Sequence, residues 1–422
     1  NHPARSLEEG GMMAGQERIV SVLDIGSTRV KMLIASATGD SLDSILGVGT
    51  APCSSLKRGV VVDMEGVTQA IQTARNEAER MSSYSVSSVI VNVGGTHITG
   101  LVNRGLVAIS RPGREIQKDD VDRVWESARA VLLGPNQEII HVIPRQYLVD
   151  GQEGIKDPLR MSGIRLEFEA FIVTGQSTIL DNLRRCVTES GLKVDKLVLE
   201  GLASADAVLS AEEKEIGVAC VDIGGDTTDL AVFTGGSLSY VAVLPIGGRH
   251  VTMDLAMMLK TSLNVAEELK VAYGSVDASR GKDFQDSQVS YSTASGDGVL
   301  ATTKSYISDV VTSRIEEIAE AVKLELVHSS YNNMLPAGLV LTGGTAMVSH
   351  ITDKFSEISG LRARVGQPTV DDVVFSSFKN PSFSTSVGLL ELGIHSDGAA
   401  VQRKKRAFKG LSGLFKGLDL FD

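Results

Sequence analysis

The sequence predicts an α/β fold built of two halves, with a small α+β subdomain inserted into the first half and an amphipathic helix at the C-terminal end. Three observations predict it. Short β-branched runs alternate with segments of helical periodicity along most of the 422 residues. An acidic, glycine-rich hairpin sequence occurs once in each half. The last twenty residues differ in composition from the rest of the chain.

In the first half, apolar runs on either side of a Gly-Ser-Thr turn predict a strand, a tight turn and a second strand. Between residues 90 and 165 short strands alternate with one helical segment, which indicates the inserted subdomain. The expected elements are strands at 19–23, 30–35, 86–93, 106–109 and 146–149, and helices at 67–81 and 118–132.

In the second half strands and helices alternate again, and a Ser-, Asp-, Gly- and Thr-rich stretch at 277–303 predicts polar β structure or a loop. The expected elements are strands at 168–174, 196–199, 217–223, 229–233 and 339–342, and helices at 177–190, 203–209, 252–261, 265–273 and 307–331.

The composition excludes several classes of protein. The formal net charge of −11 disfavours non-specific binding to nucleic acid, because phosphates repel an acidic chain. Three widely spaced cysteines without a Cys-x-x-Cys pair disfavour a disulfide framework or structural zinc, and they fit a reducing cytoplasm. No run approaches 18 apolar residues, so no membrane-spanning helix is expected. Residues 1–17 lack a signal-peptide core and are expected to be a disordered or cloning-derived tail.

The repeated hairpin is the main chemical signal. Val22 to Thr28 reads VLDIGST, and Cys220 to Thr227 reads CVDIGGDT. A glycine and hydroxyl turn leaves backbone N–H groups free for an anion, and a carboxylate at the strand end can hold hydrated magnesium. One such hairpin alone is most often an ordinary β-turn. Two facing hairpins would clamp a polyphosphate, with Asp24 and Asp222 placing Mg²⁺. The expected further contacts are Gly26, Ser27, Thr28, Lys31, Gly224, Gly225, Thr227 and Thr228.

Three further elements suit a nucleotide. A buried strand runs into Gly343-Gly344, which allow close approach of a sugar or ring, and Met347 can pack against a base. Gly247-Gly248 likewise follow a strand and precede a helix. Glu267 and Lys270 lie one helical turn apart and can bond ribose hydroxyls; the alternative is a solvent-exposed salt bridge.

The order of these elements resembles the ATPase superfamily of actin, the heat-shock chaperones and the sugar kinases. The resemblance spans roughly residues 18–395 and implies an actin-like two-lobed fold with ATP and Mg²⁺ in the cleft between the lobes. By rough alignment with the chaperones, Glu200 is the candidate for orienting an attacking water; a surface glutamate before a helix is the alternative. The second loop departs from the usual Gly-Gly-Gly-Thr, since it reads Gly225-Asp226-Thr227. A carboxylate in a phosphate loop repels phosphate unless it points outward or helps to hold Mg²⁺. ATP binding with slow or absent hydrolysis is therefore expected.

Within that superfamily the chain is similar to the FtsA family of bacterial cell-division proteins. The insertion replaces the subdomain expected in actin, residues 386–393 resemble the helix that closes the family's core, and the terminal segment resembles its membrane-targeting helix. The implied domains are 1–17, a tail; 18–89 and 166–200, the first-lobe core; 90–165, the inserted subdomain; 201–240 and 311–395, the second-lobe core; 241–310, a small second-lobe subdomain; 396–402, a linker; and 403–422, the amphipathic helix.

The resemblance implies a protein that polymerises on the cytoplasmic face of the inner membrane at the division site. It would tether filaments of the tubulin-like protein FtsZ and recruit later division proteins through the insertion. The FtsZ C-terminal tail would bind the small second-lobe subdomain, with Lys304 and Arg314 as possible contacts. The rivals are a metabolic kinase or phosphatase of the same superfamily, for which no clear acceptor site is present, and a pilus-assembly scaffold, which the C-terminal tail disfavours.

The terminal segment predicts membrane attachment on its own residues. Residues 403–422 hold six basic and two acidic side chains, a net of +4, so the remainder carries −15. Apolar side chains fall on one helical face, which is typical of an interfacial helix on anionic lipid. The alternatives are docking on the protein's own surface or a nucleic-acid patch. The expected lipid contacts are Arg403, Lys404, Lys405, Arg406, Phe408, Lys409, Leu411, Leu414, Phe415, Leu418 and Phe421.

Overall fold

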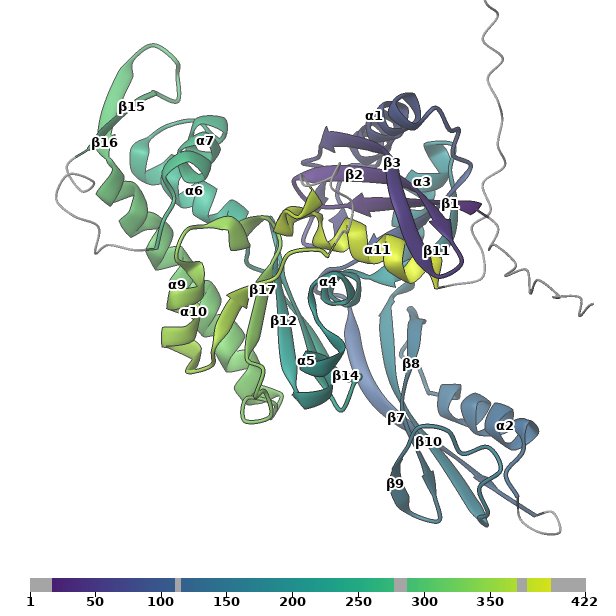
Figure 1. Cartoon of the computed structure of the whole chain (residues 1–422). Helices are drawn as coiled ribbons and strands as arrows, with labels where there is room; N and C mark the ends of the chain where they lie inside the picture. Colours follow the sequence, from purple (N-terminus) through teal and green to yellow (C-terminus); the bar gives the residue numbers. More distant parts are fainter. Residues whose placement is uncertain (1–16, 111–114, 277–286, 370–377, 396–422) are drawn as a thin grey trace, which may run out of the picture.

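A computed structural model describes residues 17–110, 115–276, 287–369 and 378–395, and it shows two lobes joined at a central pair of helices (Figure 1). The first lobe is built on a five-stranded sheet. Its strands, in spatial order, are β11 (Lys193–Leu199), β6 (Ser88–Val93), β1 (Glu17–Ile25), β2 (Arg29–Thr38) and β3 (Ser41–Pro52). The sequence did not predict β3, in which buried residues alternate with half-buried ones from Ile45 to Ala51.

The second lobe repeats this sheet. Its order is β18 (Ala363–Val365), β17 (Leu339–Thr342), β12 (Val218–Ile223), β13 (Thr228–Thr234) and β14 (Ser237–Leu244). In both sheets the central strand pairs in parallel with one neighbour and in an antiparallel hairpin with the other. The twice-occurring sequence therefore marks a structural duplication, with hairpins β1–β2 and β12–β13 in equivalent places.

Helices cover the outer faces of both sheets because their apolar residues recur at helical spacing. In the first lobe α1 (Met64–Ser82) and α3 (Ser177–Glu189) pack on a common core. Val67, Ile71 and Ala74 of α1 are fully buried there. In the second lobe the covering helices are α6 (Gly248–Leu259), α7 (Leu263–Tyr273), α9 (Lys304–His328) and α10 (Ile351–Ser359).

Two helices cross between the lobes, α4 (Glu200–Val208) and α11 (Ser384–Ile394). They touch at Gly388, where a Cβ atom would lie 1.8 Å from the carbonyl oxygen of Ala203. Figure 1 shows α11, in yellow, between the first-lobe sheet and α4. The chain thus returns to the lobe interface just before residue 396.

The inserted segment forms a separate four-stranded sheet, lower right in Figure 1. Its strands in order are β7 (Thr99–Ala108), β10 (Arg165–Gln176), β8 (Gln137–Val149) and β9 (Gln152–Ile155), with α2 (Lys118–Arg129) on one face. Trp125 of α2 stacks on Phe168 at 4.4 Å between ring centroids. Strand β10 begins at the expected boundary, residue 165, yet pairs with β7 and β8 of the insertion along its length.

Smaller elements complete the described chain. They are β4 (Leu56–Lys57), β5 (Val60–Val61), α5 (Ala211–Ile216), the hairpin β15 (Gln288–Ser292) with β16 (Val299–Thr303), and the 3-10 turns η1 (Gly344–Met347) and η3 (Pro381–Phe383). After Gly343 the chain forms only the short turn η1, and the next α-helix begins at Ile351. None of the helices described is long and apolar enough to cross a bilayer.

Candidate functional site

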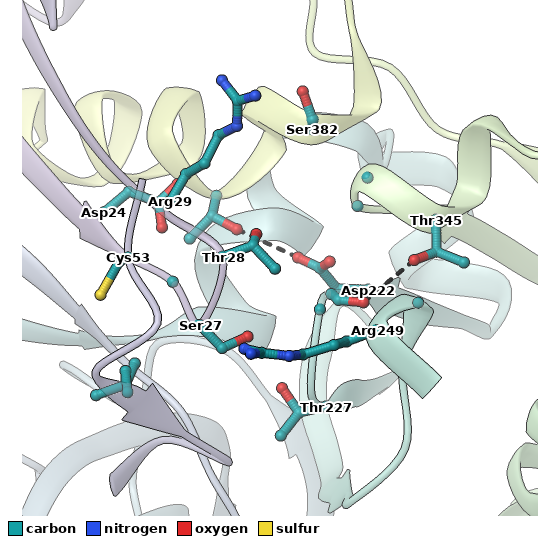
Figure 2. A pocket seen from close by; sticks show the side chains of 18 of the residues that line it. Asp24, Ser27, Thr28, Arg29, Cys53, Asp222, Thr227, Arg249, Thr345 and Ser382 are labelled. Carbon is teal, nitrogen blue, oxygen red and sulfur yellow. Dashed lines mark hydrogen bonds between the residues drawn. The ribbon is translucent and has the colours of Figure 1, made fainter. Parts of the chain in front are cut away.

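A cleft of about 1020 Å³ lies between the lobes and is lined by both hairpin turns (Figure 2). Each turn is closed by a backbone bond: Gly26 donates to Arg29 at 3.0 Å, and Gly224 donates to Thr227 at 2.9 Å. The turns touch across the cleft, where the backbone N–H of Asp226 donates to Ser27 Oγ at 3.1 Å. The structure therefore brings the two predicted anion-binding turns face to face.

Asp24 ends β1 as a buried carboxylate with defined partners. Lys31, which is opposite it in the hairpin register, approaches Asp24 Oδ2 at 2.9 Å. Lys31 also donates to the carbonyl oxygen of Ser382 at 2.7 Å. Ser386 Oγ donates to the same Asp24 oxygen at 2.7 Å. The sequence predicted Lys31 as a contact of the polyphosphate, and neither its pairing with Asp24 nor the α11 hydroxyl was expected.

Asp222 occupies the equivalent place at the end of β12. Its Oδ2 accepts hydrogen bonds from Ser204 Oγ and, at 3.2 Å, from Thr385 Oγ1. Burial raises the pKa of the Asp222 carboxyl, and the charge of Asp24 raises it further, against the opposing effect of those hydrogen bonds. The two carboxylates are therefore near enough to repel one another.

Glu200 begins α4 and lines the cleft, where it is partly buried rather than lying on the open surface. Asn92 at the end of β6 donates to Glu200 Oε2 at 3.3 Å and accepts from the backbone N–H of Ile25 at 2.7 Å. Burial raises the pKa of Glu200 well above its ordinary value, and the charges of Asp229 and Asp222 raise it further.

Asp229 is a site residue that the sequence reasoning did not select. It pairs with Asp222 across the β12–β13 hairpin and is buried, with Oδ1 lacking a hydrogen-bond partner within the described chain. Burial raises the pKa of Asp229 to about 8, with the charge of Asp222 adding to the effect. The sequence did contain a sign of it: Asp229 follows the turn at the start of an apolar run, at the position that faces Asp222 in the hairpin.

Arg249 is a second cleft residue that the sequence reasoning did not select, and it offers a cation to the unusual aspartate of the second loop, Asp226. The Nε atom of Arg249, in the first turn of α6, lies 4.0 Å from Asp226 Oδ1. Figure 2 shows the guanidinium extended between Ser27 and Thr227. The acidic residue in the second loop is thus partly neutralised by a neighbouring cation.

In the second lobe, Glu267 and Lys270 form an ion pair of 2.7 Å that lines the cleft. The pair is buried on one side only, because 12% of the Lys270 side chain is exposed but 48% of the Glu267 side chain is. Lys270 also donates to Thr252 Oγ1 at 2.9 Å and to the carbonyl oxygen of Gly248 at 3.2 Å. Through these contacts α7 is tied to the start of α6.

Most of the predicted nucleotide contacts meet at this cleft. It is lined by Asp24, Gly26, Ser27, Thr28, Lys31, Glu200, Asp222, Gly224, Gly225, Thr227, Gly248, Glu267, Lys270, Gly343, Gly344 and Met347. Thr228 and Gly247 are not among the lining residues. The Thr228 hydroxyl donates instead to the carbonyl oxygen of Ile246 at 2.8 Å, and Gly247 packs against the second hairpin.

The predicted partner contacts lie apart from one another. Lys304 lines the cleft and stacks over the Tyr273 ring at 5.4 Å. Arg314 binds both oxygens of Asp254 on α6, at 2.7 and 2.9 Å. The predicted lipid contacts from Arg403 to Phe421 lie outside the described residues.

Comparisons with known proteins agree with this architecture. A family model described as cell division protein FtsA matches residues 219–388, and one described as the SHS2 domain inserted in FtsA matches 95–174. The cell division protein FtsA of Pseudomonas aeruginosa is 38% identical, over 94% of this chain and 93% of that protein. The protein of the same name from Bacillus subtilis is 37% identical, over 94% and 88%.

Two solved structures show the same fold. The PilM–PilN type IV pilus biogenesis complex matches with a TM-score of 0.63 and 18% identity, over 89% of this chain and 99% of that one. MreB5 of Spiroplasma citri bound to ADP matches with a TM-score of 0.51 and 15% identity, over 88% and 94%. At these identities the likeness concerns the fold alone, and it confirms the predicted actin-like, two-lobed class.

Proposed function

The chain belongs to the FtsA family of cell division proteins, and from that membership and the geometry of the cleft we propose that it binds ATP with magnesium between its lobes. The observation that carries this is the contact of two equivalent anion-binding turns across one cleft. Gly26, Gly224 and Asp226 already donate their backbone N–H groups within and between the turns. The remaining N–H groups of the turns and the hydroxyls of Ser27, Thr28 and Thr227 suit the phosphates. Glu267 and Lys270 suit the ribose hydroxyls, and Gly343, Gly344 and Met347 suit the base.

The carboxylates of the cleft fit a divalent cation. The charges of Asp229, Asp222 and Asp24 all raise the pKa of Glu200, and the cation that opposes them is Lys31. Several buried carboxylates beside a single lysine leave negative charge unbalanced, which favours a bound cation, and oxygen atoms are the ligands that Mg²⁺ prefers. Asp24 and Asp222 would hold its water shell, and the cation would supply charge neutralisation beside the β- and γ-phosphates.

Slow or absent hydrolysis follows from the state of Glu200. A residue that orients an attacking water accepts its proton best as a carboxylate. The raised pKa of Glu200 favours the protonated form, which weakens that role. A bound cation lowers the pKa of nearby acids, so turnover would depend on full assembly of the site.

We further propose that the acidic FtsZ tail binds the small second-lobe subdomain, residues 241–310, with Lys304 and Arg314 as contacts. Beside the Arg314–Asp254 pair, Met253 and Met257 of α6 are 45% and 74% exposed. Exposed methionines next to a cation suit a peptide that carries both apolar and acidic side chains. The remaining proposed activities are self-assembly of the chain into filaments and contact with other division proteins through the inserted subdomain. Residues 403–422 would attach these filaments to anionic lipid, on the cytoplasmic face of the inner membrane at the division site.

The nucleotide proposal is tested by Asp222→Ala. We expect affinity for ATP in Mg²⁺ to fall at least roughly ten-fold while affinity in EDTA changes little, because the variant loses a cation ligand. Equilibrium binding of a fluorescent ATP analogue measures both. Asp181→Ala removes an exposed first-lobe carboxylate outside the cleft and is the control. Equal affinity of Asp222→Ala and the parent chain in Mg²⁺ would contradict the proposal.

The assembly proposal is tested by electron microscopy of the full chain with ATP on anionic lipid monolayers. Ordered filaments that need both ATP and anionic lipid are expected. Steady ATP turnover that depends on an added sugar, without filaments, would instead support the metabolic-kinase rival.

A further inference from the structure

The first turn of α11 forms hydrogen bonds with both candidate metal ligands, although these come from different lobes. Ser386 Oγ donates to Asp24 Oδ2 at 2.7 Å, and Thr385 Oγ1 donates to Asp222 Oδ2 at 3.2 Å. The preceding 3-10 turn adds a third link, because the Ser382 carbonyl accepts from Lys31. Two adjacent residues of one helix therefore hold the strand-end carboxylates of both halves of the duplication.

This network is shielded from water. Ser386 and Ser204 are fully buried, and Thr385 is 6% exposed. Ser204 on α4 donates to Asp222 Oδ2 and lies 2.9 Å from the Thr385 hydroxyl, so α4 and α11 act on the same oxygen. Hydrogen bonds from buried hydroxyls to a carboxylate are stronger than those at the surface, because water does not compete for them.

The hydrogen bonds of the described residues select one oxygen of each carboxylate. All of those named above end on Oδ2, while both side chains line the cleft. The space beside the other oxygen of Asp222 is kept open by Gly343, where a Cβ atom would lie 2.2 Å from Oδ1. Gly343 also has φ +85°, a conformation that favours glycine.

We propose that Thr385 and Ser386 are positioning residues for the cation of the bound nucleotide. By holding Oδ2, each hydroxyl would direct the second oxygen of its carboxylate into the cleft, where these residues would hold the hydrated cation. Because both hydroxyls belong to one helical turn, the cation site is complete only while α11 contacts both lobes. This inference rests on the proposed function, and it names the residues that set the affinity of the nucleotide site for Mg²⁺.

The test is a magnesium titration of nucleotide binding, with a fluorescent ATP analogue and the full chain. Ser386→Ala should raise the Mg²⁺ midpoint roughly ten-fold, which is the scale of one charge-assisted hydrogen bond. Thr385→Val keeps the side-chain shape and should raise it several-fold, since Ser204 still holds Asp222. Binding in EDTA should stay as in the parent chain, and Ser386→Thr should restore the midpoint.

Ser384→Ala is the matched control. Ser384 lies in the same turn and is fully buried, but its hydroxyl pairs with Thr342 Oγ1 at 2.6 Å and with neither carboxylate. Its Mg²⁺ midpoint should be unchanged. Thermal unfolding in EDTA checks each variant, and Thr385→Val decides the matter if Ser386→Ala does not fold.

The outcomes separate the two proposals. A parent chain that binds no nucleotide overturns the proposed function and this inference with it. A parent chain with magnesium-dependent binding, together with unshifted midpoints in Ser386→Ala and Thr385→Val, overturns the inference alone. So does an equal shift in Ser384→Ala, which would assign the effect to packing of the turn.

Discussion

Glu391 makes the crossing of α4 and α11 sensitive to pH. It lies in the last turn of α11, and burial raises its pKa from 4.5 to about 8, with the charge of Asp206 adding to the effect. An acid whose pKa is higher in the folded than in the unfolded protein prefers to stay protonated in the folded state. The native state therefore loses stability as pH rises from about 4.5, and the loss is complete above about 8.

The interval between 4.5 and about 8 corresponds to about 5 kcal/mol, at roughly 1.36 kcal/mol per pH unit. This is an upper bound, because Glu391 keeps some contact with water. We expect about 2–3 kcal/mol. Glu391→Gln removes the titration, so the variant should gain this amount relative to the parent chain between pH 4.5 and pH 8.5, whatever constant cost the amide carries.

Urea unfolding followed by circular dichroism at a series of pH values measures the difference between the two chains. Glu320→Gln, on the exposed face of α9, is the control, and its difference from the parent should not change with pH. A constant difference between Glu391→Gln and the parent over the whole range would refute the reasoning, since it would show that Glu391 ionises in the folded protein as it does in the unfolded chain.

Three further predictions concern other parts of the molecule. Arg249→Ala leaves Asp226 without its cation beside the phosphates, so ATP affinity should fall several-fold in equilibrium binding, and adding Asp226→Asn should recover most of it; no recovery would contradict the pairing. Gly388→Ala places a methyl group against the Ala203 carbonyl and should destabilise the chain by about 2–3 kcal/mol in urea unfolding, whereas an unchanged midpoint would show that the helices can separate freely. Phe415→Glu should abolish co-sedimentation with anionic liposomes, because it puts a charge on the apolar face of the tail; full retention would exclude that face as the attachment site.

The local sequence pattern was sufficient to predict the two equivalent hairpins. The apolar run before Asp24, the glycine-hydroxyl turn and the apolar run after it encode a hairpin within about twenty residues, and the same holds around Asp222. Strand β3 escaped prediction because its buried residues, two of them glycines, alternate with half-buried ones that are mostly apolar too, so no clear two-residue pattern is visible. The helix α10 and the strand β18 are short, with nine and three residues. The sequence predicted the end of the inserted subdomain at residue 165, where β10 begins. Strand β10 pairs with β7 and β8 of the insertion, and strand pairing is not visible in periodicity.

The candidate site likewise contains some residues that the sequence predicted and others that only the structure revealed. Asp24, Lys31 and Asp222 belong to the hairpins themselves, so their chemistry is local and the sequence by itself determined it. The surroundings are not local. Asn92, Arg249, Thr385 and Ser386 reach the hairpins from distant segments, and nothing in their own neighbourhoods distinguishes them from ordinary polar residues.

The sequence by itself determined the twice-occurring hairpin turn with its strand-end aspartate and a basic tail whose apolar residues recur at helical spacing, because each depends on residues close together in the chain. Only the tertiary structure decided which carboxylates lie together, which of them favour a proton, and that one helical turn holds a carboxylate from each lobe. Ionisation depends on burial and on charges a few ångströms away, and both are set by segments that meet only when the lobes close on α4 and α11.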